Sequence, residues 1–245
     1  MAFPNVESTA TTGRAAETTS PVAFPATISA NALIVCIARC AVAGAIGWPS
    51  GWVELVEDSS DGSDDVTAIA YFTAVGNEDG TTFNVTHGNG KSSYIVYSIT
   101  GAEVPATQVP QISTVVIGTD TAPDPGLLTP TGGAKDYLWL WLGAWDTETT
   151  SPPTGNPTNY SGPLGASTGT GGLPATNCRC ASAQRNLNAA SENPPSWTIS
   201  NSPNGWSAWT MAIHPAAAQT LQLAGISAAV STATGALAVK HSLAG

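Results

Sequence analysis

The sequence predicts an all-β protein: an antiparallel β-sandwich or jelly roll built from two related halves, with a C-terminal extended arm. Helix signals are scarce, and short runs of β-branched and aromatic residues recur between Gly, Pro, Asn and Asp residues. The runs that we predict as strands lie at residues 31–44, 51–58, 65–76, 81–88, 92–101, 112–118, 136–145, 178–187, 196–200 and 205–215.

A weak internal repeat predicts that the strand order occurs twice. The run "NALIVCIARCAV" in the first half resembles "DYLWLWLGAW" in the second, and a loop containing Pro, Gly and an aromatic residue follows each. The halves close with the aromatic-rich runs "SSYIVYSITGAE" and "GWSAWTMAIHPA". Two related halves in one sandwich explain this pattern, although two unrelated β-meanders would look similar at this level.

Several runs are too apolar for strands with one face in water. The stretches "LIVCIA" and "YLWLWLGAW" fit central strands that are covered on both sides, or strands that lie against another subunit. The alternation of a strand places Trp139 and Trp141 on one face, and Trp206 and Trp209 on opposite faces. We expect most tryptophans to serve core packing.

The composition predicts three parts: an extended segment at 1–20, the sandwich at 21–215 and an assembly arm at 216–245. Pro215 stops the last strand, and the arm carries Leu-Ala-Gly twice with Lys240 as its one charged side chain. An arm this apolar stays ordered by packing on its own domain or on neighbouring copies. The apolar residues that we expect to mediate assembly are Leu221, Leu223, Ile226, Leu237, Val239 and Leu243.

Charge excludes two classes of partner. A net charge of −10 with seven scattered Lys and Arg residues argues against nucleic acid and against an anionic membrane surface. The sequence has no apolar window long enough for a transmembrane helix, and its first residues lack the pattern of a signal peptide. The low content of charged residues, 10%, is nevertheless typical of an exported protein. A trimmed secreted protein and a virion protein released by lysis both fit these facts.

The cysteines form two close pairs, Cys36 with Cys40 and Cys178 with Cys180, and each pair shares one face of an extended strand. Four thiolates would suit structural zinc, but zinc knuckles lie at turns and these pairs do not. We therefore expect buried free thiols or one bridge between neighbouring strands.

The acidic run "EDSSDGSDD" at 57–65 is a candidate calcium loop. Calcium binds six to eight oxygen ligands in flexible acidic loops, and the candidate ligands are Asp58, Asp61, Asp64 and Asp65. The spacing differs from that of an EF-hand, so we favour a solvated turn without a cofactor.

Loop aromatics offer a candidate glycan site. Trp48, Trp52 and Tyr160 lie in predicted loops, although capping the ends of the sandwich explains them more simply. We assign no catalytic residue, because the three histidines stand alone and no catalytic motif occurs. A glycan-degrading enzyme would need paired carboxylates, and Glu54, Glu57, Glu103 and Glu192 are scattered.

The order of "NALIV", "PSGWVEL", "IAYFTAVGNEDGTTFNVT", "SSYIVYSITGAE" and "WSAWTMAIHP" resembles jelly-roll-like structural proteins of tailed bacteriophages. The tail "LAGISAAVSTATGALAVKHSLAG" is similar to repeats appended to such decoration and fibre proteins. The resemblance implies a non-enzymatic virion protein that is made in the host cytoplasm and exposed on the particle. Its implied partners are other copies, in a trimer, and other virion proteins.

Within that resemblance we favour capsid decoration over a tail fibre, because the chain has no long fibrous repeat and carries one short arm. The alternative is a tail fibre or adhesion module that binds a glycan or receptor on the host surface.

Overall fold

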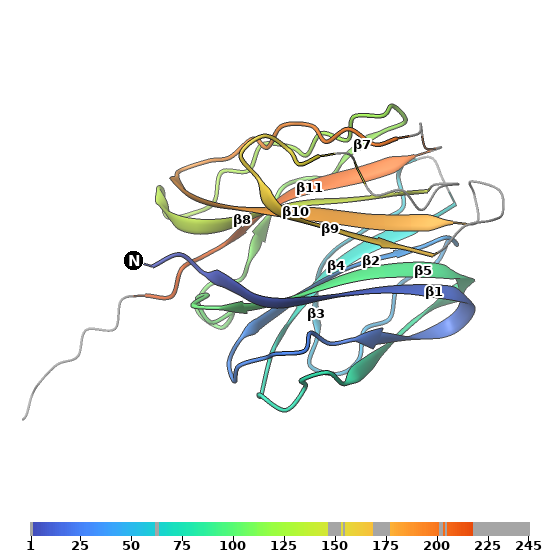
Figure 1. Cartoon of the computed structure of the whole chain (residues 1–245), viewed down its shortest axis with the longest axis horizontal. Coiled ribbons are helices and arrows are strands. Elements are labelled where there is room, and N and C mark those ends of the chain that lie inside the picture. Colours follow the sequence, from blue (N-terminus) through green and yellow to red (C-terminus); the bar gives the residue numbers. More distant parts are fainter. Residues whose placement is uncertain are drawn as a thin grey trace, which may run out of the picture.

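Two antiparallel β-sheets pack face to face in the computed structural model of the chain (Figure 1). The structure describes residues 2–61, 64–146, 153, 155–168, 177–200, 203 and 205–217. Within these residues there are eleven strands and no helix. The predicted all-β sandwich is confirmed.

Each sheet comes from one contiguous half of the chain. Sheet 1 has the order β1-β5-β2-β4-β3, and sheet 2 has the order β6-β11-β8-β10-β9, with β7 also paired to β11. The strands of sheet 1 are β1 (Asn5–Ala23), β2 (Leu33–Cys40), β3 (Val53–Asp58), β4 (Val66–Thr73) and β5 (Thr82–Thr100). Those of sheet 2 are β6 (Gln111–Ile112), β7 (Val116–Gly118), β8 (Lys135–Asp146), β9 (Ser161–Ser167), β10 (Cys178–Ala189) and β11 (Trp206–Ile213).

The two sheets have the same strand order. If β1, β2, β3, β4 and β5 are matched to β6, β8, β9, β10 and β11, the order of sheet 1 becomes the order of sheet 2. The match pairs the runs that the sequence repeat relates, so the two related halves are confirmed. Because each half forms its own sheet, the chain passes between the named sheets once, between β5 and β6. A jelly roll would pass between its sheets repeatedly.

Several strand boundaries differ from the prediction. The runs at 81–88 and 92–101 form one long strand, β5, and the run at 112–118 divides into β6 and β7. The run at 196–200 is not a strand. β1 and β9 were not predicted, because they consist largely of small residues such as Ala, Ser, Thr and Gly. The predicted boundary after residue 20 is therefore wrong, since β1 already belongs to sheet 1 from Asn5.

The central strands alternate between two apolar environments. In β2, Leu33, Val35 and Ile37 face the layer between the sheets, where they pack with Leu138, Leu140 and Leu142 of β8. The intervening residues of β2 belong to a second cluster, on the outer face of sheet 1. All of β2 and all of β11 are consequently buried. The prediction of strands covered on both sides is confirmed.

Loops supply the outer covers. Ile28 and Ile46, with the half-buried Trp48 and Trp52, pack on the outer face of sheet 1. Tyr160, Trp197 and Ile199 pack on the outer face of sheet 2, against Trp141, Trp145 and Trp206. The predicted tryptophan faces are confirmed: Trp139 and Trp141 both lie on the outer side, and Trp209 faces inward, opposite to Trp206.

A buried ion cluster ties the loop between β3 and β4 to the sandwich. Arg39 of β2 is 1% exposed, and its guanidinium lies 2.7 Å from Asp61 and 3.1 Å from Asp65. It also donates a hydrogen bond to Thr67 Oγ1 at 3.0 Å. Buried charges of this kind are tolerated only when they are paired.

We expect Arg39→Met to lower the free energy of unfolding by about 3–5 kcal/mol, because it leaves two carboxylates buried without their cation. The matched control is Arg14→Met, whose ion pair with Glu17 is 35% and 27% exposed. That change should cost about 0–1 kcal/mol. Urea unfolding of both variants measures the difference, and equal losses would contradict the structural role of the cluster.

Candidate functional site

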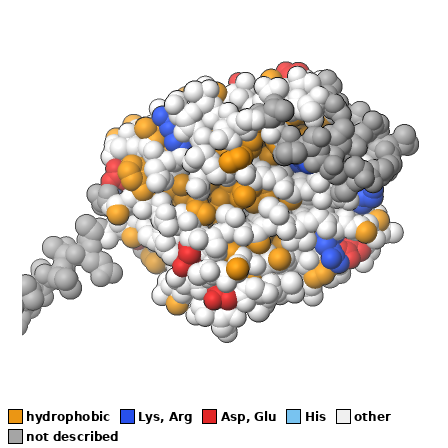
Figure 2. Space-filling model, viewed as in Figure 1, with side chains coloured by type: hydrophobic (Ala, Val, Ile, Leu, Met, Phe, Trp, Pro, Cys, Tyr) orange, Lys and Arg blue, Asp and Glu red, His pale blue; other side chains and the backbone are white. Residues whose placement is uncertain are grey.

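The candidate site is a groove between the edge strands β1 and β9. These strands end their sheets on the same side of the sandwich and run along each other in Figure 1. Between them lies an open hollow of about 300 Å³, lined by Val6, Glu7, Ser8, Thr9, Tyr97, Gly162, Pro163, Leu164 and Gln184. Figure 2 shows hydrophobic side chains gathered in a band across this face, at the height of the gap between the two strands.

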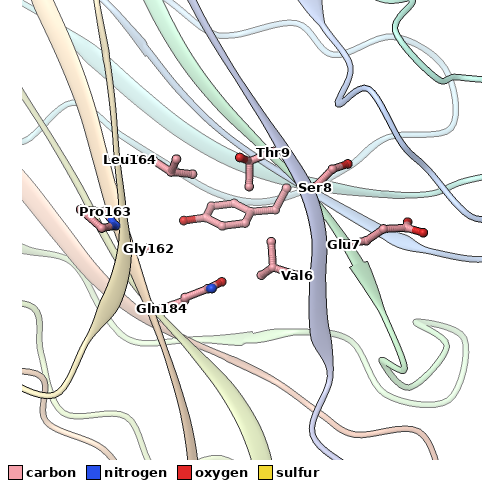
Figure 3. Close-up of a pocket in the computed structure, with 9 residues that line it drawn as sticks. Val6, Glu7, Ser8, Thr9, Gly162, Pro163, Leu164 and Gln184 are labelled. Atoms are coloured by element: carbon pink, nitrogen blue, oxygen red, sulfur yellow. The ribbon is translucent and has the colours of Figure 1, made fainter.

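A β-bulge between Val6 and Ser8 shapes the β1 wall. It directs Val6 and Thr9 into the groove, whereas Glu7 and Ser8 point to the other side of the strand (Figure 3). The Glu7 carboxylate accepts hydrogen bonds from the Ser29 side chain at 2.5 Å and backbone at 2.9 Å. These bonds lower the pKa of Glu7. The carboxylate therefore anchors a loop, and the groove wall itself is uncharged.

A second bulge shapes the β9 wall. The pairing of β10 with β9 shifts between Ser182 and Gln184, opposite Gly162, whose φ is 57°. Gly162 favours this left-handed conformation, and Pro163 next to it has no backbone N–H. The side chain of Gln184 points into the groove (Figure 3). Its Oε1 atom is buried and has no hydrogen-bond partner among the described residues.

Tyr97 of β5 forms the floor. It is 1% exposed, and its hydroxyl lies 2.6 Å from Ser182 Oγ of β10, so the pair joins sheet 1 to sheet 2. Burial raises the pKa of Tyr97, which keeps the phenol neutral. The floor is thus apolar except for one internally satisfied hydroxyl pair.

The groove closes at one end. Gly13 of β1 lies against the backbone carbonyl of Ser167 in β9, so closely that a β-carbon on residue 13 would overlap it. A larger residue at position 13 would push the two edges apart. The hollow lies on the N-terminal side of this contact along β1, between residues 6–9 of β1 and residues 162–164 of β9.

The other side of β9 carries a second hollow, of about 410 Å³. Pro163 and Leu164 line both hollows, and the second is completed by Pro153, Gly155, Asn156, Gly165 and Trp197. The segment around Pro163 is consequently accessible from two sides.

The predicted glycan residues do not form one site. Trp48 and Trp52 stack at 5.4 Å on the outer face of sheet 1, and Trp48 Nε1 donates to Glu54 at 2.9 Å. Tyr160 lies on the outer face of sheet 2, is 5% exposed and donates to Glu192 at 3.2 Å. The two tryptophans cover the outer face of sheet 1.

The predicted calcium ligands are not arranged around a common cation. Asp61 and Asp65 pair with Arg39, and Asp58 accepts a hydrogen bond from Ser207 at 3.0 Å. Asp64 is exposed, whereas Asp61 and Asp65 are buried. Among the described residues, no group of three His, Cys, Asp or Glu side chains is placed to hold a metal ion. Because Asp61 and Asp65 are buried in ion pairs, the loop is not a freely solvated turn.

The cysteines are buried free thiols, one of the two forms that the sequence allowed. Cys178 donates to the Arg39 carbonyl at 3.2 Å, and Cys180 donates to the Ser93 carbonyl at 3.3 Å. Burial raises the pKa of Cys40 and Cys180 to about 12. Protonated thiols of this kind are poor nucleophiles and poor metal ligands.

The sequence did not indicate one polar cluster, which joins β1 to β5. Ser20 Oγ lies 2.9 Å from His87 Nε2, 2.9 Å from Glu17 Oε1 and 2.8 Å from Ser92 Oγ. A serine next to a histidine resembles a nucleophile and its base. However, Ser20 is fully buried, so this hydroxyl has no access to a substrate.

Comparison with protein-family models, with curated proteins and with solved structures finds no match for the chain. The described residues include no helix that is long and apolar enough to cross a membrane. The apolar residues predicted to mediate assembly, Leu221 to Leu243, lie outside the described residues.

The Tyr97–Ser182 hydrogen bond predicts an energetic coupling between the two sheets. We expect Tyr97→Phe and Ser182→Ala each to lower the free energy of unfolding by about 1–3 kcal/mol. Each change removes one hydroxyl and leaves the other hydroxyl of the pair buried without that partner. The double variant should lose less than the sum of the two. Urea unfolding of the four proteins measures this coupling, and strict additivity would show that the hydroxyls do not interact.

The buried carboxylates predict a pH-dependent stability. Burial raises the pKa of Asp65 from 3.8 to about 6, despite the opposing effect of Arg39. Between these values the folded chain holds a proton that the unfolded chain has released, so this group makes the free energy of unfolding fall as pH rises. Each pKa unit between the folded and the unfolded chain changes the free energy of unfolding by about 1.4 kcal/mol across this pH range. Asp65→Asn should reduce the dependence of the free energy of unfolding on pH between 3.8 and about 6, as measured by urea unfolding at several pH values. An unchanged pH dependence would contradict the raised pKa of Asp65.

Proposed function

We propose that the chain is a non-enzymatic structural protein of a tailed-phage virion, with a sandwich that faces outward and residues 216–245 that associate with neighbouring copies. Capsid decoration is the role we favour. The observation that carries the proposal is the open groove between two sheet edges, because unpaired strand edges are surfaces for adding further chain.

The use of the interior polar groups supports this proposal. The carboxylates of Asp61 and Asp65 pair with Arg39, and the hydroxyl of Ser20 is shared among three partners inside the fold. Glu192 in turn holds Arg185 at 2.8 Å, as well as Tyr160. These groups stabilise loops and strands, which suits a rigid building block.

The position of the last described residues also supports the proposal. Ala216 N donates to Gly101 O at 2.8 Å, and Ala217 N donates to Glu103 Oε2 at 2.9 Å. The chain is therefore held to the sandwich up to Ala217 before residues 218–245 follow. A segment attached at such a fixed point can bridge two copies.

An adhesion module is the second candidate, and the tryptophan stack favours it. Trp48 and Trp52 are half-buried and stacked, and the Glu54 carboxylate lies beside them. A sugar ring could stack on the outer indole, with the carboxylate accepting hydrogen bonds from its hydroxyls. Removal of residues 218–245 would leave this activity intact.

We expect the full chain to be an oligomer in light scattering and the 1–217 truncation to be a folded monomer. The cut at 217 keeps the hydrogen bonds of Ala216 and Ala217 to the sandwich, so a β-type circular dichroism spectrum should persist. Monomers in both cases would contradict assembly through the C-terminal residues. Binding of the truncation to a glycan array, lost in Trp48→Ala, would favour the adhesion module instead.

A further inference from the structure

We propose that the groove between β1 and β9 is the receptor for residues 218–245 of a neighbouring copy, which add there as an extended strand. This inference rests on the proposed assembly function and names the surface that receives the segment.

The backbone of the groove suits an added strand. β1 pairs with β5 and β9 pairs with β10, and neither has a second strand partner among the described residues. Edge strands of this kind present N–H and C=O groups that another chain can satisfy. The partnerless Oε1 of Gln184 adds an acceptor for a backbone N–H. Recognition through the main chain needs no charged side chains.

The chemistry of the groove matches that of the segment. Val6 and Leu164 present an apolar surface above the buried ring of Tyr97, and Glu7 is held on the far side of β1. Residues 218–245 contain one charged side chain, Lys240, and the stretch "GALAV" at 235–239 alternates between small and larger apolar residues. A strand with this alternation places one apolar row against the groove floor.

The segment starts at the end of the sandwich where β1 begins. Ala216 is bonded to Gly101, which follows the residue paired with Asn5 at the start of β1. Figure 1 shows the last described residues leaving the sandwich beside the N-terminus, on the side where β1 begins. The point of departure and the hollow therefore lie at the same end of the molecule.

A neighbouring copy is favoured over the same copy because of the residues that follow. The last described residues leave the sandwich beside the N-terminus (Figure 1), and the sequence has no Gly, Pro, Asn, Asp or Ser from Ala216 to Ala224. These are the residues that make tight turns. For the segment to enter the groove of its own molecule, the chain would have to turn back within residues 216–224, and their composition disfavours a tight turn. An extended chain spans about 3.3 Å per residue, so the segment can reach an adjacent molecule.

The first test places a charge in the groove. Thr9→Lys puts an ammonium group among the apolar lining residues, and Thr18→Lys makes the same change on an exposed part of β1 beyond the closed end. We expect Thr9→Lys to reduce the mass in light scattering to that of one chain, 24.7 kDa, with an unchanged circular dichroism spectrum. Thr18→Lys should have the same oligomer mass in light scattering as the unsubstituted full-length chain. Oligomers of equal mass for both variants would overturn the proposal.

The second test identifies the occupant. A photo-crosslinking amino acid at position 9 is introduced into isotopically heavy and light chains, which are mixed, dissociated and reassembled. We expect crosslinks from position 9 to peptides of 218–245, with half of the crosslinked pairs joining a heavy chain to a light one. Crosslinks within single chains only would overturn the assignment to a neighbouring copy.

The outcomes separate this inference from the proposed function. An oligomer that depends on residues 218–245 but gives no crosslink from position 9 to them overturns the groove as receptor and leaves the assembly function standing. A full chain and a 1–217 truncation that are both monomeric overturn the assembly function itself.

Discussion

Burial of both faces of the central strands is the constraint on which the rest of the fold depends. Every residue of β2 and of β11 is buried, and their side chains alternate between the layer shared by the sheets and an outer apolar cluster. Sheets of this kind need a cover on each outer face. The long connections supply these covers, with Ile28, Ile46 and Trp52 on sheet 1 and with Trp197 and Ile199 on sheet 2. The connections that cover the outer faces do not cover the sheet edges. The outer edges of β1 and β9 therefore have no strand partner among the described residues.

The same constraint explains the buried polar groups. A chain that surrounds its central strands with further layers also encloses the side chains at their ends, such as Arg39 and Tyr97. Each of these polar groups must find its partner within the protein, because an unpaired buried charge or hydroxyl is costly. Arg39 finds carboxylates in the loop between β3 and β4, and Tyr97 finds Ser182 in the opposite sheet. Polar chemistry in the interior thus holds loops and sheets in place.

Sequence patterns identified the strands that depend on apolar burial. β2, β8 and β11 were predicted because β-branched and aromatic residues dominate them. The repeat between the halves also predicted that β8 occupies in sheet 2 the position that β2 has in sheet 1, and β11 that of β5. β1 and β9 gave no such signal, since small residues dominate edge strands that bury little apolar surface. The groove is built from these two strands, so the candidate site could not be predicted although the fold class could. The acidic loop was misjudged for a related reason: its partner Arg39 is distant in sequence and brought close only by the tertiary fold.

The formation of each sheet from one contiguous half has a consequence for how molecules can exchange parts. The segment between Thr100 and Gln111 is the passage from one named sheet to the other. If it straightened, the first half of one molecule could pack on the second half of another and reproduce the shared apolar layer. Such domain swapping builds dimers from contacts that the single molecule already uses. An exchange of this kind would need no surface beyond the apolar layer that the two halves already share.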